Sequence, residues 1–265
     1  MQQWQNVLGR VSFVNCDPLY HNLPREWEIL PAPPSWLTGH LLRKDCIIAP
    51  IPTADFAKNA DKLQLIPGLG IVSKGTVGSV LLFGNRDPTL MRDIALPTDS
   101  STSRKLMMWV LEQMGINPRP VDMGPDLEQM LTRCDGALLI GDRAMDEAAR
   151  HPELVKIDLG QAWYELTGYP MVFGVFAAHK DTDAVKLNGV RDLFMEQLNL
   201  FQNDTIHRRD VIESTSHRSG FSKERVQQYF DEEVGWLLDS ASTKGLDYFL
   251  ENVCGINEYH ELEQQ

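Results

Sequence analysis

Short apolar runs alternate along the chain with stretches of helical periodicity. The runs that predict buried strands cover residues 9–14, 46–51, 94–96 and 137–140. After the third run, Leu106, Val110 and Met114 share one face of a predicted helix, and Gly115 is placed to end it. Strands that alternate with helices in this way predict an α/β fold, with a mostly parallel sheet covered on both faces.

The last third of the chain has the periodicity of helices. Apolar side chains recur at helical spacing over residues 190–201, 226–234 and 246–253. The stretch 69–83 differs, because it predicts two extended segments on either side of Gly75.

Two extended stretches, near residues 83–87 and 171–177, are suited to cross between lobes. We therefore predict a first lobe from residues 1–85 and 175–265, in which the return segment adds the C-terminal helices. Residues 86–174 form the predicted second lobe. A chain that leaves one lobe, builds another and returns creates a cleft between them.

Composition and charge narrow the classes of function. The chain has 265 residues, with 25 Lys and Arg against 37 Asp and Glu, which gives a formal net charge of −12. This balance argues against a protein that follows nucleic-acid phosphates or binds anionic membrane surfaces. Hydrophobic residues make up 43% and charged residues 23%, which excludes a disordered chain.

Motif searches point to no metal or cofactor. The four cysteines form no CxxC pair and the seven histidines show no HExxH spacing. No nucleotide fingerprint, GxxxxGK[ST] loop or GxSxG elbow is present in the sequence. The N-terminal stretch lacks the pattern of a secretory signal, and no apolar run has the length of a membrane span. We expect a cytoplasmic protein that needs no cofactor.

Candidate site residues lie where the predicted strands end, since ligands of open α/β sheets bind at the carboxyl ends of the strands. These junctions carry mostly neutral hydrogen-bonding groups, at Asn15, Thr53, Ser100, Ser101, Thr102, Ser103, Gly141 and Asp142. The hydroxyl cluster before a helix favours an anion, although N-capping alone also explains it. For Asn15, spacing alone favours an Asx turn before Pro18 over a role in the site.

Three further positions have two interpretations each. Ser79 either points into the cleft or lies on a strand without a role. Trp163 and Tyr169 either wall a pocket for a ring or belong to the core, which is the more frequent place for aromatic residues.

Several stretches of the sequence together resemble one enzyme family. They read VSFVNCDPL (11–19), LIPGLGIVSKGTVGSVLLF (65–83), PDLEQML (125–131), DGALLIGDRAM (135–145) and DLGQAWYELTGYPMVFGVF (158–176). In this order and spacing they resemble the chorismate dehydratases of the futalosine route to menaquinone. The resemblance implies a two-lobed fold like type II periplasmic solute-binding proteins, in a protein that works as a cytoplasmic enzyme.

The resemblance also implies a reaction and roles for residues. The family is a group of hydro-lyases, in which chorismate loses the C4 hydroxyl as water and the C3 proton to give 3-[(1-carboxyvinyl)oxy]benzoate. Asn15 matches the family's asparagine at a strand end, which orients the substrate and the proton transfer. Ser79 and the segment 101–103 match substrate-binding positions, and Thr53 stands where the family usually has serine. Chorismate is then the expected small-molecule partner.

Two alternatives to this interpretation are open. The naphthoate synthase of the same fold (1,4-dihydroxy-6-naphthoate synthase) carries a histidine base where this chain aligns Gly141, which favours the dehydratase. A non-catalytic binding protein for an aromatic acid is the alternative from another class.

The proton acceptor is also open. We take the substrate's own enolpyruvyl carboxylate as the base, with Asp142 as the alternative. The chain departs from the family pattern at Ser101, where the family commonly has arginine, and at Asp99, where an acid enters.

Overall fold

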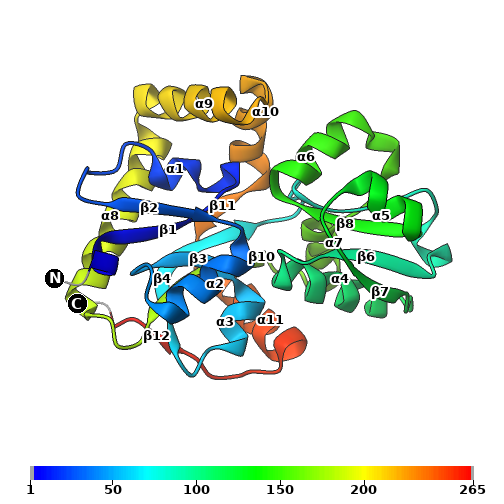
Figure 1. Cartoon of the computed structure of the whole chain (residues 1–265), viewed down its shortest axis with the longest axis horizontal. Coiled ribbons are helices and arrows are strands. Elements are labelled where there is room, and N and C mark those ends of the chain that lie inside the picture. Colours follow the sequence, from blue (N-terminus) through cyan, green and yellow to red (C-terminus); the bar gives the residue numbers. More distant parts are fainter. Residues whose placement is uncertain (1–2, 264–265) are drawn as a thin grey trace.

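The chain forms two α/β lobes that lie side by side along the long axis of the molecule (Figure 1). The first lobe has a five-stranded sheet and a separate two-stranded parallel sheet of Val7–Val11 (β1) and Glu28–Ala32 (β2), and the second lobe has one five-stranded sheet. The structure is a computed structural model, and it describes residues 3–263. Both ends of the described chain lie in the first lobe, and the middle of the sequence builds the second lobe, on the right in Figure 1. None of the helices in this part of the chain is both long and apolar enough to cross a membrane.

Each lobe alternates strands and helices. The first-lobe strands are Val7–Val11 (β1), Glu28–Ala32 (β2), Ala49–Pro52 (β3), Leu63–Ser73 (β4), Met171–His179 (β10), Gly235–Leu237 (β11) and His260–Glu261 (β12). Its helices are Asp17–Tyr20 (α1), Pro34–Arg43 (α2), Thr53–Lys58 (α3), Ala184–Asn203 (α8), Thr205–Ser219 (α9), Lys223–Gln228 (α10) and Ser240–Phe249 (α11). Two π-helical turns, Tyr229–Glu233 and Leu250–Cys254, follow α10 and α11.

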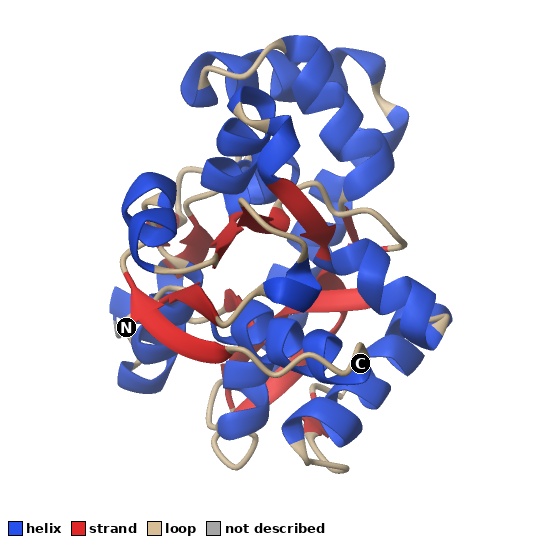
Figure 2. Ribbon diagram, turned by 90° about the vertical axis from the view of Figure 1, so that its right-hand side faces the viewer, coloured by secondary structure: helices blue, strands red, loops and turns tan. Residues whose placement is uncertain are grey.

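The second lobe is smaller. Its strands are Val80–Gly84 (β5), Asp93–Pro97 (β6), Arg119–Met123 (β7), Gly136–Ile140 (β8) and Val155–Asp158 (β9). Its helices are Ser101–Gln113 (α4), Leu127–Arg133 (α5), Gly141–Arg150 (α6) and Leu159–Thr167 (α7). Figure 2, viewed from the side of this lobe, shows helices surrounding the strands.

Both five-stranded sheets are mixed, so the prediction of a mostly parallel sheet was too simple. The first sheet has the order β11-β4-β10-β3, and β10 runs antiparallel to β3 and β4. The second has the order β7-β6-β8-β5-β9, and β5 runs antiparallel to β8 and β9. The reason is the chain path: β5 and β10 are the strands by which the chain enters each lobe. They start at the boundary between the lobes, where the parallel strands end.

The chain crosses between the lobes at other points than the sequence indicated. β5 lies before residue 86 but belongs to the second sheet, and all of β10 belongs to the first sheet, including residues 171–174. The first crossing is therefore the segment 74–79. Because β5 is buried along its whole length, its residues carry no pattern that tells which sheet it joins.

Most of the predicted elements form, with shifted ends. The first predicted strand, 9–14, ends at Val11 and gives way to a 3₁₀ turn over Val14–Cys16. Gly115 and Gly255 follow their helices with positive φ angles of 74° and 75°, as expected of helix ends. The three predicted helical stripes of the last third pack into the core, where Phe194, Tyr229 and Phe249 are fully buried.

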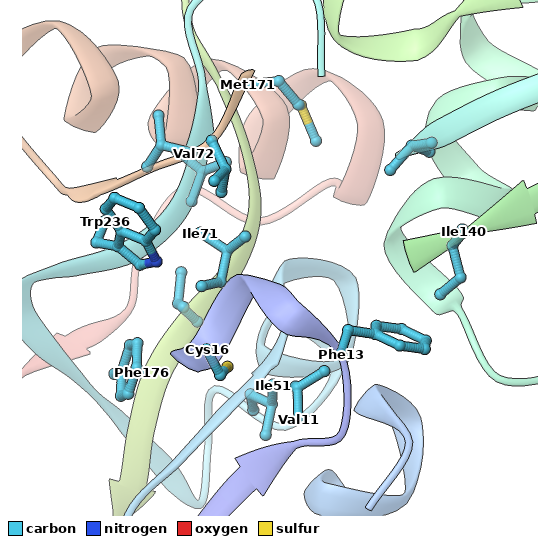
Figure 3. Close-up of a cluster of buried hydrophobic side chains, with 14 of the residues drawn as sticks. Val11, Phe13, Cys16, Ile51, Ile71, Val72, Ile140, Met171, Phe176 and Trp236 are labelled. Atoms are coloured by element: carbon cyan, nitrogen blue, oxygen red, sulfur yellow. The ribbon is translucent and has the colours of Figure 1, made fainter. Parts of the chain in front are cut away.

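The interior between the lobes is aromatic. Trp163 of α7 is fully buried and contacts the rings of Trp109, Tyr248 and Phe249, while its indole N–H donates to the Pro170 carbonyl at 3.3 Å. Tyr169 packs on Tyr248. Trp163 and Tyr169 therefore belong to the aromatic core between the lobes. This favours the core interpretation of the two residues over the interpretation that they wall a pocket. Figure 3 shows the neighbouring part of the buried apolar cluster.

Gly245→Ala is expected to lower the free energy of unfolding by about 1–3 kcal/mol, because overpacking forces backbone shifts. A Cβ at Gly245 of α11 would lie 2.1 Å from the Pro170 carbonyl oxygen. Gly189→Ala in α8 is the matched control, since no atom lies within 4 Å of its added Cβ. Replacing Gly189 by alanine improves helix propensity by about 1 kcal/mol, so this variant should be at least as stable as the wild type. Urea unfolding compares the two, and equal stabilities would contradict the close packing of α11.

Candidate functional site

A pocket opens between the two lobes, at the carboxyl ends of their parallel strands. The space within it, including the part that is open to solvent, is about 600 Å³. Most of its wall is apolar, with residues from the ends of strands and the starts of the crossing strands: Val11, Phe13, Ile51, Ile71, Val80, Ile140 and Phe173. Its polar groups are neutral, at Asn15, Ser79, Ser100, Thr102, Ser103 and Tyr229. No charged side chain of residues 3–263 lines this pocket.

The structure brings most of the predicted site residues together. Six of the nine line this one pocket, namely Asn15, Ser79, Ser100, Thr102, Ser103 and Gly141. The other three, Thr53, Ser101 and Asp142, lie outside it. The sequence positions of the six span 126 residues between Asn15 and Gly141, so only the convergence of strand ends places them side by side.

Asn15 lies in the turn after β1, and its backbone is held firmly. The indole N–H of Trp236 donates to the Asn15 carbonyl oxygen at 2.6 Å. The Oδ1 atom of the Asn15 side chain is buried and has no hydrogen-bond partner among the described residues. A buried amide oxygen without a partner is costly, and a ligand that donates a hydrogen bond there would recover that cost.

Ser79 and Tyr229 form a hydrogen-bonded pair in the pocket wall. Their hydroxyl oxygens are 3.0 Å apart, and both side chains are buried. Burial raises the pKa of the Tyr229 phenol above its ordinary value, which keeps it neutral. Tyr229 was missed as a site residue, because its helical spacing predicts a core position. No local signal in the sequence joins it to Ser79, which lies 150 residues away.

The start of α4 supplies the hydroxyl cluster. Ser100 precedes the helix without capping it, since no side chain accepts from the backbone of the first turn. The Thr102 hydroxyl accepts a hydrogen bond from the Ala54 backbone N–H at 3.0 Å, which joins α4 to α3. An uncapped helix start with neighbouring hydroxyls is a site suited to a carboxylate.

Thr53 and Ser101 do not line this pocket, so its geometry does not support the prediction that they bind substrate. The Thr53 hydroxyl donates to the Val172 carbonyl at 2.7 Å, and the side chain is fully buried. It therefore joins α3 to β10. Ser101 lies on the opposite side of the α4 start, where it lines a groove beside α2 and α3. Successive residues of a helix point about 100° apart, so a run of four hydroxyls cannot all face one cleft.

Asp142 also lies behind the pocket wall. Its Oδ1 atom accepts the Val14 backbone N–H at 3.0 Å, across the boundary between the lobes. Burial raises the pKa of the Asp142 carboxyl, while the hydrogen bond from Val14 and the charge of Arg218 oppose that rise. Since it does not line the pocket, the structure gives no support to Asp142 as the base that takes a substrate proton.

Phe13 and Gly141 lie in close contact across the boundary between the lobes. Figure 3 shows the Phe13 ring pointing from the first lobe toward Ile140 of β8. A Cβ at Gly141 would lie 2.6–2.7 Å from atoms of that ring, and Gly141 has a φ of +62°. Sequence reasoning missed Phe13 because it counted the residue as part of the first strand. Position 141 therefore requires glycine both for space and for backbone conformation.

Charged residues lie near the pocket but pair with each other. Asp17 of α1 accepts hydrogen bonds from Arg218 at 2.7 and 2.9 Å and is also bonded to Arg10. Burial raises the pKa of the nearby Cys16 thiol to about 12, so the thiol stays neutral near pH 7. The pocket can thus bind a ligand through neutral groups and dipoles, within a mostly apolar wall.

Comparisons with known proteins agree on family and fold. A family model described as menaquinone biosynthesis matches residues 7–253. The chorismate dehydratase of Thermus thermophilus is 30% identical over 241 residues, which cover 84% of this chain and 86% of that protein.

Two solved structures are similar in fold. Protein AF1704 of Archaeoglobus fulgidus has a TM-score of 0.71 at 16% identity, covering 94% of this chain and 97% of that one. The Candida albicans CA3427 product, described as having the generic periplasmic binding protein fold, has a TM-score of 0.67 at 13% identity, covering 98% and 97%. The predicted fold class, α/β with two lobes like periplasmic binding proteins, is confirmed.

Gly141→Ala is expected to destabilise the protein more than Gly68→Ala. Both glycines have positive φ angles, 62° and 83°, so both substitutions carry backbone strain of about 1–2 kcal/mol. Only at position 141 does the added Cβ meet another group, the Phe13 ring, whereas nothing lies within 4 Å at position 68. The contact should add about 1–3 kcal/mol to the loss of unfolding free energy, measured by urea titration. Equal losses would mean that Phe13 does not press on Gly141.

Proposed function

Because the chain belongs to the menaquinone biosynthesis family, we propose that it is a hydro-lyase that dehydrates chorismate to 3-[(1-carboxyvinyl)oxy]benzoate. The family assignment rests on a match over residues 7–253 and on the Thermus thermophilus chorismate dehydratase. The pocket between the lobes provides the structural support for this proposal. It is an apolar, uncharged cavity whose neutral donors lie at strand ends and at the start of α4.

The reaction breaks two bonds between ring carbons of the substrate and their substituents. The C3–H bond gives up its proton, its electron pair forms the new ring double bond, and the C4 hydroxyl leaves with a proton as water. The ring becomes aromatic, so the driving force is large. The protein therefore has to hold the ring in one orientation, stabilise the departing oxygen and keep the proton acceptor in reach.

The pocket has parts suited to each of these tasks. The apolar wall of Phe13, Ile140 and Phe173 fits the faces of a carbon ring. Ser100 and Ser103, at the uncapped start of α4, offer hydroxyl groups to a carboxylate, beside the positive end of the helix dipole. Asn15 enters the pocket with an amide oxygen that lacks a partner in the described chain.

Asn15 is the proposed catalytic residue. Its amide is both a donor and an acceptor, so it can hold the C4 hydroxyl as it leaves. The proton acceptor is the enolpyruvyl carboxylate of the substrate, which hangs from C3 beside the proton to be removed. The pocket wall supports this assignment, because no carboxylate, imidazole or amine of residues 3–263 lines it.

We place the reaction in the futalosine route to menaquinone and the protein in the cytoplasm. The family resemblance supports the route. The four cysteines are unpaired thiols, which is typical of proteins in a reducing compartment.

Purified protein mixed with chorismate alone is expected to yield a product lighter by one water, detected by mass spectrometry. Asn15→Ala should lower kcat at least tenfold, because the group that guides the leaving hydroxyl is lost; a tenfold loss corresponds to about 1.4 kcal/mol of barrier. Asn203→Ala, at the exposed end of α8, is the matched control and should retain wild-type kcat.

Two results would argue against this function. A loss of less than tenfold in Asn15→Ala would remove the role given to Asn15. Measurable binding of chorismate without any loss of water would instead identify a binding protein for an aromatic acid.

A further inference from the structure

The two residues that lead into the pocket are held from opposite lobes. The Val14 N–H donates to Asp142 of α6 in the second lobe at 3.0 Å. The Asn15 carbonyl accepts from the Trp236 indole of β11 in the first lobe at 2.6 Å. The first hydrogen bond is made by the residue that precedes Asn15 and the second by the carbonyl of Asn15 itself, so the two hold the segment on either side of the Asn15 Cα atom.

The Asn15 side chain has no hydrogen bond of its own to set its direction. Its Oδ1 atom is buried without a partner among residues 3–263. Because a side chain pivots on its backbone, the path of the Val14–Asn15 segment decides where the amide enters the pocket. An error of about 1 Å in such a position costs a large part of a catalytic rate.

Asp142 is well suited to hold this segment. It stands in the first turn of α6, where the helix dipole favours a carboxylate. The short side chain has few rotamers, and its neighbour Gly141 packs directly against Phe13, so the helix start and the segment are in contact over two successive residues.

The charges around Asp142 leave Val14 as its specific partner. The neighbouring titratable and charged groups come from five other elements: Arg10, Cys16, Asp17, Arg218 and Tyr229. Of these, Arg10 and Arg218 both form ion pairs with Asp17. Their charge steadies the Asp142 carboxylate, but the hydrogen bond that the structure gives this carboxylate comes from the Val14 N–H.

We propose that Asp142 is a positioning residue, which fixes the Asn15 amide in the pocket by accepting the Val14 N–H across the boundary between the lobes. This inference rests on the proposed dehydration for its kinetic consequence, and on the observed contacts alone for its structural one. In this role Asp142 never touches substrate and exchanges no proton with it. What matters is an acceptor oxygen at this place, so asparagine should replace aspartate well.

Two variants and one control test the role. Asp142→Ala removes the acceptor, and Asp142→Asn keeps an oxygen that can accept the Val14 N–H. Asp146→Ala, one turn further along α6, removes an exposed carboxylate that pairs with Arg150. Thermal unfolding and circular dichroism first establish that each variant is folded.

The first measurement is the indole N–H resonance of Trp236 in protein labelled with ¹⁵N-tryptophan, assigned by its absence in Trp236→Phe. This indole bonds to the Asn15 carbonyl, so it reports on the segment without any substrate. Asp142→Ala is expected to shift the resonance, whereas Asp142→Asn and Asp146→Ala leave it in place.

The second measurement is turnover of chorismate. Asp142→Ala should lower kcat by about tenfold to hundredfold with little change in KM, because the ring-binding walls are intact and only the Asn15 amide is misplaced. Asp142→Asn should restore most of kcat.

The outcomes separate this inference from the proposed function. If the wild type does not dehydrate chorismate, the proposed function fails, and the Trp236 resonance still decides whether Asp142 holds the segment. An unshifted resonance in Asp142→Ala overturns the inference, as does a kcat equal to that of the wild type. If Asp142→Asn is as slow as Asp142→Ala, the carboxylate acts by its charge or its proton, and the positioning role is wrong.

Discussion

The rest of the structure depends on one constraint, that the chain must pass twice between two sheets whose parallel strands all end at the same boundary. The segment 74–79 and the start of β10 make these passages, so β5 and β10 run against their neighbours. The strands that run opposite to β5 and β10, such as β3, β4 and β8, deliver their following loops to the boundary, and polar residues far apart in sequence meet there. The cleft is thus a consequence of topology, and its chemistry depends on which residues follow each strand.

The same constraint explains how an acidic protein can offer a site to an anion. With a net charge of −12, the overall field repels a dianion such as chorismate. At the boundary, however, the charges are paired behind the wall, as in the group formed by Arg10, Asp17 and Arg218. The pocket presents hydroxyls and the uncapped start of α4, whose dipoles favour an anion. The local field, and not the net charge, then decides which ligand enters.

Sequence reasoning could find the strand ends and therefore most of the site. Asn15, Ser79 and Gly141 each follow or begin a strand that local apolar runs predict, and all three line the pocket. It could not find Tyr229, whose place beside Ser79 depends on how the last third of the chain folds back over the first lobe.

Errors inside the hydroxyl cluster have a different cause. The run from Ser100 to Ser103 has one composition but turns with the helix, so Ser101 faces another groove. Thr53 is a strand-end residue whose hydroxyl satisfies a buried carbonyl instead of a ligand. Composition and spacing identify a junction, whereas the direction of each side chain depends on the helix phase and on hydrogen-bond demands of the core.

Gly141 shows how the fold limits the chemistry at this site. In the naphthoate synthase that the sequence also resembles, a histidine stands at the aligned position and acts as base. Here any side chain at 141 would enter the space of the Phe13 ring, and the backbone has a conformation that favours glycine. A base cannot be gained at this position unless Phe13 also moves. The Phe13 ring and the backbone conformation thus leave no room for a protein base at position 141, which is consistent with the proposal that the substrate carries its own base.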